Sequence, residues 1–140
     1  MRFIYVETSY LLSVLFREPG HEPYKETLEE ANSFFSSDVT LCECHRAVSR
    51  GIQAGFLLEA EGATLRGILA VIANAWNFLS CTEEILIRAG ALFPVEPVRT
   101  LDAIHLASAL QVRQVHSKLE VASNDRCIIE NLAPLGLNGL

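Results

Sequence analysis

Short runs of β-branched and aromatic residues alternate along this chain with longer stretches in which apolar side chains recur at helical spacing. Strands are predicted at 3–6, 33–36, 77–81 and 119–122, with a last edge strand in the tail from residue 134. Helices are predicted at 9–16, 23–31, 37–52, 54–74, 82–92, 100–114 and 126–132. Strands separated by helices usually form a parallel sheet with helices on both faces. The pattern therefore predicts a three-layer α/β/α sandwich with a central parallel sheet.

The bulk properties suit one globular domain, 1–140. The chain has 140 residues, of which 50% are hydrophobic and 20% are charged, and such a length buries a sizeable core. The longest strictly apolar run, Ile68 to Ala73, is far shorter than the roughly 20 residues that span a bilayer. Glu7 interrupts the first apolar stretch, so we predict no signal peptide, no membrane association and a cytoplasmic location.

The four cysteines show no C-x-x-C spacing, and a chain of this size does not need disulfides for stability. Cys42, Cys44 and His45 together resemble a soft-metal cluster, but structural zinc sites usually combine two paired clusters. We therefore predict buried, reduced thiols at all four positions.

Four acidic residues lie in apolar surroundings at the predicted junctions of strands and helices: Glu7, Glu43, Asp102 and Asp125. A carboxylate is costly in such surroundings unless a partner compensates its charge. In a parallel α/β sheet the functional crevice lies at the carboxyl ends of the strands, where Glu7 and Asp125 are predicted. Glu43 and Asp102 would enter the same crevice near helix N-termini, which favour anions. We therefore predict that the four acids converge on one divalent-metal pocket.

Three of the four acids, taken singly, also have an ordinary structural explanation. Asp102 suits a helix-dipole partner in a first helical turn, and Glu43 suits a surface acid one turn before Arg46. Asp125 suits a turn or N-cap residue. His105, one turn after Asp102, is better explained as a structural histidine than as a metal ligand. It is the joint order of the acids along the chain that favours a site.

That order, and the residues around it, resemble the PIN-domain family of metal-dependent ribonucleases, in particular the VapC-like toxins of bacterial toxin–antitoxin pairs. The resemblance covers almost the whole chain and is carried by residues 5–20, 41–47, 101–109 and 123–125. Its most specific segment is Leu101-Asp102-Ala103-Ile104-His105-Leu106-Ala107-Ser108-Ala109.

The resemblance implies a metal-dependent endoribonuclease in which Glu7, Glu43, Asp102 and Asp125 bind Mg²⁺ or Mn²⁺ and catalyse RNA hydrolysis. Two carboxylates about 4 Å apart repel by roughly 4 kcal/mol at an effective dielectric constant of about 20, and an oxygen-seeking cation removes that penalty. Hydrogen bonds from Thr8, Ser9 and Ser123 are expected to support these ligands at the cofactor site.

The resemblance also implies three partners: an RNA substrate, a small protein antitoxin and a second copy of the chain. The net charge of −6 argues against RNA binding through the overall field. Residues 99–126 are nevertheless locally balanced, with four basic and three acidic side chains. The candidates for gripping RNA phosphates are Arg17, Arg46, Arg50, Arg99 and Arg126. An antitoxin would lay an amphipathic segment across the acidic cleft. The apolar stretch Gly67 to Trp76 serves either as a dimer face or, more simply, as core.

Glu7 departs from the family pattern, in which the first acid is normally aspartate. Its carboxylate lies about 1.5 Å further from the backbone, and Mg²⁺ requires near-octahedral geometry at about 2.0–2.1 Å. Glu7 either reaches the ion through another rotamer or a water, or it leaves a site that is weakened, prefers Mn²⁺ or is inactive. An inactive site would make the chain a PIN-like scaffold that binds RNA or a protein without cleaving. A phosphoacceptor receiver domain is disfavoured because neither Lys25 nor Lys118 stands in a suitable motif.

Overall fold

Parallel strands form one central sheet in the computed structural model, which describes residues 1–30 and 32–140. The strands are β1 (Phe3–Val6), β2 (Ser33–Ser37), β3 (Asn77–Leu79), β4 (Glu120–Ala122) and β5 (Asn138–Gly139). Their order across the sheet is β3-β2-β1-β4-β5, and every neighbouring pair is parallel. The first strand of the chain therefore lies at the centre of the sheet, between β2 and β4.

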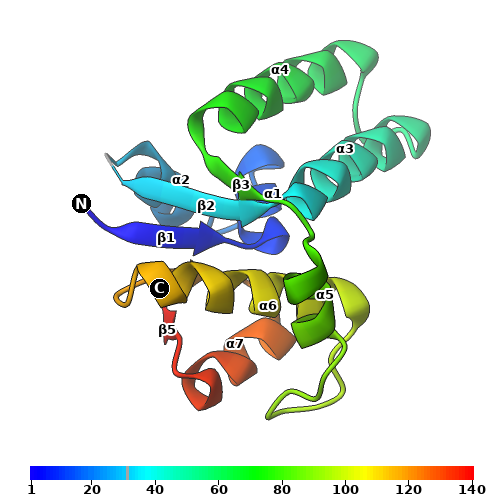
Figure 1. Cartoon of the computed structure of the whole chain (residues 1–140). Helices are drawn as coiled ribbons and strands as arrows, with labels where there is room; N and C mark the ends of the chain where they lie inside the picture. Colours follow the sequence, from blue (N-terminus) through cyan, green and yellow to red (C-terminus); the bar gives the residue numbers. More distant parts are fainter. Residues whose placement is uncertain (31) are drawn as a thin grey trace.

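Helices cover both faces of this sheet (Figure 1). They are α1 (Thr8–Leu15), α2 (Glu22–Glu29), α3 (Asp38–Gln53), α4 (Glu59–Ala75), α5 (Glu83–Ala89), α6 (Thr100–Val115) and α7 (Arg126–Leu132), followed by a 3₁₀ turn, η1 (Ala133–Leu135). Ile4 and Val6 pack into a core with α1, α3 and α4, whereas Tyr5 packs into a second core with α6 and α7. Because successive side chains of a strand point to opposite faces, β1 contributes to both cores. The predicted three-layer α/β/α sandwich is confirmed.

The predicted helix at 54–74 begins too early. Gly55 adopts a left-handed backbone conformation with φ of 82°, and the Phe56 amide donates to the carbonyl of Gly51 at 2.9 Å. These features close α3 in a Schellman turn, so residues 54–58 connect two helices. The resulting pair, α3 and α4, projects past the edge of the sheet (Figure 1).

Other boundaries differ by a few residues. Helix α5 ends at Ala89, before the predicted residue 92, and β3 ends at Leu79, before residue 81. The helix predicted at 23–31 is α2, and the last residue of that prediction, Ala31, lies outside the described residues. Among the helices that the structure describes, none combines the length and the apolarity needed to cross a bilayer.

None of the four thiols is paired in a disulfide, and only Cys44 is fully buried. Cys42 is exposed, and Cys81 and Cys127 are half-buried. Cys44 faces the core whereas Cys42 faces solvent, so these two residues of α3 do not form a common metal cluster. The prediction of burial was wrong for the other three thiols because periodicity alone did not identify which face of each element is covered.

Candidate metal site at the carboxyl edge of the sheet

The two central strands end side by side, and each leads directly into an acidic segment. Val6 of β1 is in register with Ala122 of β4, and the Glu7 amide donates to the carbonyl of Ala122 at 2.9 Å. Glu7 follows β1, while Asp125 lies three residues beyond β4. This register brings residues more than 110 positions apart to one edge of the sheet, where ligand sites of parallel sheets lie.

The carboxylate of Glu7 is buried and held by three hydrogen-bond donors. Its side chain is 4% exposed and caps α1 by accepting from the Ser9 amide at 3.1 Å. The Ser9 hydroxyl donates to Oε2, and the Ser123 hydroxyl donates to the same oxygen at 2.7 Å. The glutamate side chain thus folds back over the start of α1, and its negative charge is compensated by dipoles rather than by a cationic side chain.

Glu43 belongs to a second network, on the inner side of α3. Its Oε1 accepts from the Thr8 hydroxyl at 2.8 Å and from His105 Nε2 at 2.9 Å. A carboxylate only accepts, so Nε2 carries the hydrogen, and Nδ1 lies 2.9 Å from the hydroxyl of Tyr5. Burial raises the pKa of Glu43, but the hydrogen bonds from His105 and Thr8 outweigh it and lower the pKa overall. Glu43 is therefore held in its ionised form.

His105 is 1% exposed and its contacts are structural, as the sequence predicted. Its carboxylate partner is Glu43 on α3. The histidine was placed correctly on its helix, but its partner lies 62 residues away. Sequence reasoning had no signal for that contact, nor for the buried Tyr5 hydroxyl behind it.

Asp102 and Asp125 lie close together, with Cys127 beside them. One carboxylate oxygen of each acid and the sulfur of Cys127 lie within 4.8 Å of one another. Asp125 also caps α7 by accepting from the Ile128 amide at 3.2 Å, and Asp102 lies in the first turn of α6. The half-exposed pair of carboxylates matches the oxygen donors that divalent cations prefer.

The negative charges at this edge act on one another. Burial raises the pKa of Asp102, and the negative charges of Asp125, Glu7 and Glu43 raise it further, against a smaller lowering by His105. The other three predicted acids therefore lie within electrostatic reach of Asp102. Asp102 and Asp125 stand at the separation of metal ligands, whereas Glu7 and Glu43 are engaged by neighbouring donors.

Cys127 is the residue that sequence reasoning missed. The thiol was treated with the other cysteines as a core residue. Asp125 precedes α7, and Cys127 is the second residue of that helix. Its position two residues after a predicted site acid was the signal available in the sequence.

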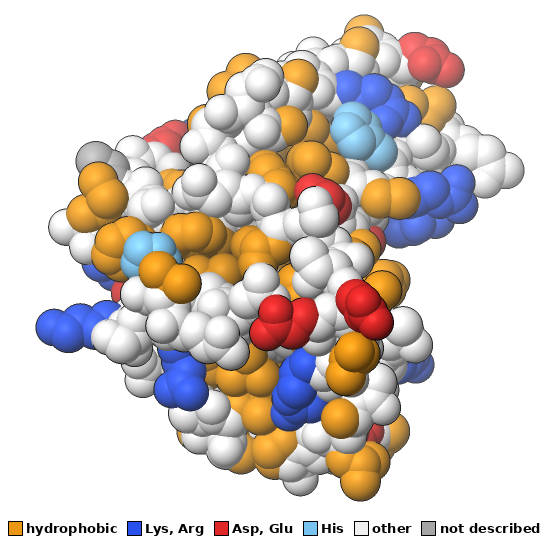
Figure 2. Space-filling view, in the orientation of Figure 1, with side chains coloured by type: hydrophobic (Ala, Val, Ile, Leu, Met, Phe, Trp, Pro, Cys, Tyr) orange, Lys and Arg blue, Asp and Glu red, His pale blue; other side chains and the backbone are white. Residues whose placement is uncertain are grey.

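A groove of about 410 Å³ runs beside Glu43, between α1, α3 and α6. Its walls include Leu12, Val39 and Leu101, with Arg46 and Arg50 among the lining residues. Both arginines are exposed, so the groove combines apolar walls with positive charge. The space-filling view shows basic side chains on the side of the molecule where α3 and α4 project, and others beside the acidic side chains nearer the middle (Figure 2).

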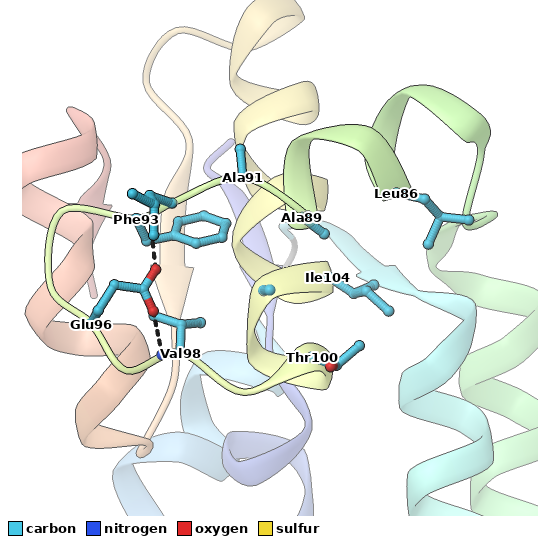
Figure 3. A pocket seen from close by; sticks show the side chains of 11 residues that line it. Leu86, Ala89, Ala91, Phe93, Glu96, Val98, Thr100 and Ile104 are labelled. Carbon is cyan, nitrogen blue, oxygen red and sulfur yellow. Dashed lines mark hydrogen bonds between the residues drawn. The ribbon is translucent and has the colours of Figure 1, made fainter.

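A second hollow of about 410 Å³ lies between α5, α6 and the loop that joins them. Its lining is largely apolar, and the Glu96 carboxylate accepts from the amides of Phe93 at 2.8 Å and Val98 at 2.7 Å (Figure 3). That carboxylate orders the loop, so the hollow presents apolar walls without a free reactive group.

Comparison with known proteins adds independent information. The family model described as "PIN domain" matches residues 4–130. Ribonuclease VapC46 of Mycobacterium tuberculosis (strain ATCC 25618 / H37Rv) is 33% identical over 109 residues, which cover 78% of this chain and 75% of that protein. A toxin–antitoxin complex from Klebsiella pneumoniae has a chain of similar fold, with a TM-score of 0.60 and 22% identity over 96% of this chain and 94% of that one. VapC20 of M. tuberculosis, a sarcin–ricin-loop-cleaving toxin, has a TM-score of 0.66 and 14% identity over 91% and 93% of the two chains.

Proposed function

Because this chain belongs to the PIN domain family, we propose that it is a metal-dependent endoribonuclease and the toxin of a toxin–antitoxin pair, acting in the cytoplasm. The observation that carries the proposal is the approach of Asp102 and Asp125 within 4.8 Å at the carboxyl edge of the sheet. Glu7 and Glu43 add negative charge to the same edge, because both raise the pKa of Asp102. The 33% identity to a ribonuclease supports RNA as the substrate.

We assign Mg²⁺ or Mn²⁺ to Asp102 and Asp125, with Glu7 and Glu43 completing the acidic set. The donors fit these ions, since all four residues offer carboxylate oxygens and the pKa of Asp102 reflects burial and uncompensated negative charge. When bound, such an ion lowers the pKa of an attacking water and stabilises the charge that develops on the phosphate.

The chain's own residues fix the orientation of these carboxylates. Ser9 and Ser123 hold Glu7, and His105 and Thr8 hold Glu43 in its ionised form. Ligands that are oriented in advance lose little conformational freedom when a cation and an RNA phosphate arrive. This is the part we assign to Thr8, Ser9 and Ser123.

The test is RNA cleavage by the purified chain on a pool of structured RNAs, with Mg²⁺, Mn²⁺ or EDTA. We expect cleavage that EDTA and Asp102→Asn both abolish, while Glu26→Gln, an exposed acid on α2, leaves it unchanged. Cleavage only after Glu7→Asp would mean a site weakened by one methylene. An active relative that cuts the same RNA pool serves as the positive control. If neither the parent nor Glu7→Asp then cleaves RNA, the proposal is contradicted and a binding scaffold is indicated.

We assign the groove beside Glu43 to the antitoxin. Its apolar walls suit the apolar face of an amphipathic segment, and Arg46 and Arg50 suit acidic residues that flank it. The related fold in a toxin–antitoxin complex supports such a partner. Co-purification with the chain's own antitoxin, lost after Leu12→Glu, would be the expected result; retention of the complex would exclude this groove.

We also propose a homodimer. In the stretch Gly67 to Trp76, Leu69 is buried and packs in the core, whereas Ile68 is 43% exposed and Val71 is 68% exposed. The stretch thus serves the core on one side and offers an apolar strip on the other. Sedimentation equilibrium should give twice the 15.5 kDa chain mass, and Val71→Glu should halve it. A 15.5 kDa species for the unaltered chain would refute the dimer.

A further inference from the structure

The sulfur of Cys127 is the one soft donor beside the two aspartates. Its distance from a carboxylate oxygen of Asp102 and of Asp125 is at most 4.8 Å, and the residue is half-buried rather than sealed in the core. Its protein contact is weak, a 3.7 Å approach to the carbonyl of Pro97. The thiol is therefore available on the side where the two acids lie.

We propose that Cys127 is a metal ligand, and that with Asp102 and Asp125 it lets this site take a borderline-soft divalent cation of the Zn²⁺ class in competition with Mg²⁺ and Mn²⁺. The inference rests on the proposed function only in placing a metal at these aspartates. Thiolate ligands select Zn²⁺ and softer ions, whereas carboxylates alone suit Mg²⁺ and Mn²⁺. Zinc sites that keep one coordination position free for water or substrate use three protein ligands. Two carboxylates and one thiolate supply that number.

The other thiols of the chain lack this arrangement. Cys44 lies on the core-facing side of α3, Cys81 approaches the hydroxyl of Ser37, and Cys42 is exposed. Within residues 1–30 and 32–140, Cys127 is the only cysteine found in a group of three metal-ligating side chains. A soft cation therefore has a specific place to bind, and Cys42 provides a matched exposed thiol as control.

The test is a Cd²⁺ titration of the full chain, followed by the ultraviolet charge-transfer absorption of a thiolate–cadmium bond. The band should form in the parent and in Cys42→Ser, and it should be absent in Cys127→Ser. Loss of a residue that merely supports a ligand costs about 10- to 100-fold in metal affinity, so Zn²⁺ affinity, measured by competition with a chromophoric chelator, should fall at least about tenfold in Cys127→Ser. Circular dichroism establishes that each variant is folded.

A charge-transfer band that persists in folded Cys127→Ser, or an unchanged Zn²⁺ affinity, would overturn the inference. RNA cleavage with Mn²⁺ in the same variants separates it from the proposed function. If Cys127→Ser cleaves RNA and still shows the charge-transfer band, the thiol ligand is refuted and the proposed nuclease activity is supported. If the band is lost in Cys127→Ser but the parent does not cleave RNA with any metal, the thiol ligand is supported and the proposed nuclease activity is refuted.

Discussion

At the scale of single residues, the direction of the Glu7 carboxylate is set by its hydrogen-bond donors. The carboxylate reaches back to the Ser9 amide and to two serine hydroxyls, so its direction depends on those serines. Ser123→Ala removes the 2.7 Å bond to Oε2, and we expect RNA cleavage to fall about 10- to 100-fold, as for other residues that orient metal ligands. Single-turnover cleavage measures the effect, with the exposed Ser117→Ala as control. Unchanged cleavage would show that Glu7 needs no support.

Asp102 is expected to reduce the stability of the metal-free protein. Burial, and then the charge of Asp125, raise its pKa above the ordinary value of 3.8, so the folded state binds this proton more tightly than the unfolded state. The resulting stability is fully present below pH 3.8 and is lost as pH rises through the folded pKa. In EDTA at pH 7, Asp102→Asn should therefore unfold about 1–3 °C higher than the parent. This difference in unfolding temperature should vanish below pH 3.8, where the parent carboxyl is protonated. Mn²⁺ should stabilise the parent but not Asp102→Asn.

The structure places Glu7 and Asp125 between a strand and a helix, whereas Glu43 lies in the second turn of α3 and Asp102 opens a helix that follows a loop. The sequence did not reveal which groups hold each acid. The partners of Glu43 are 35 and 62 residues away, and the Ser123 hydroxyl is 116 residues from Glu7. These contacts depend on strand register and on helix rotation, which a pattern of apolar residues does not specify. The contact of Cys127 with the acids was not predicted for the same reason, since Asp102 lies on another helix.

At the scale of elements, the α3–α4 pair depends on close packing at one glycine. A Cβ on Gly62 would lie 2.6 Å from Ile52 Cδ1 and 3.4 Å from Val48 Cγ1, whereas a Cβ on Gly67 meets no heavy atom within 4 Å. Both residues lie inside α4. Gly67→Ala should raise the free energy of unfolding by about 0.5–1 kcal/mol through helix propensity. Gly62→Ala should show no such gain because the Ile52 methyl group must move. Urea unfolding of both variants tests this, and equal gains would contradict close packing.

The turn that connects α3 and α4 was not predicted from the pattern of apolar residues. Gly55 was not recognised as a stop signal, since apolar residues continue at 56–58. The turn becomes evident only from its left-handed backbone and the hydrogen bonds that close α3. Alternation of strands and helices was enough for the layers, but the order of strands across the sheet required the structure.

At the scale of the whole molecule, the proposed RNA substrate would approach an acidic protein. The net charge of −6 makes the long-range field unfavourable, so binding has to rely on local basic groups such as Arg46 and Arg50, exposed beside the groove. We compare the parent with the double variant Arg46→Ala/Arg50→Ala in a plot of log affinity against log salt concentration. If both arginines neutralise phosphates of single-stranded RNA, the slope of the variant should be shallower by about 0.7 for each lost contact. Fluorescence anisotropy in EDTA measures binding without cleavage, with Lys25→Ala on α2 as control. An unchanged slope would place the RNA elsewhere.

The central position of β1 has a consequence for the order of events during synthesis. Of the strands in this sheet, β1 is synthesised before the others, yet its neighbour β4 begins only at Glu120. Parallel pairing over so long a loop is slow and cannot start before most of the chain exists. A nascent chain that carries Glu7 and Glu43 still lacks Asp125 and the serine that bonds Glu7. The acidic edge is therefore completed only after residue 125 has been made, which would give the proposed antitoxin time to reach the chain before the edge forms.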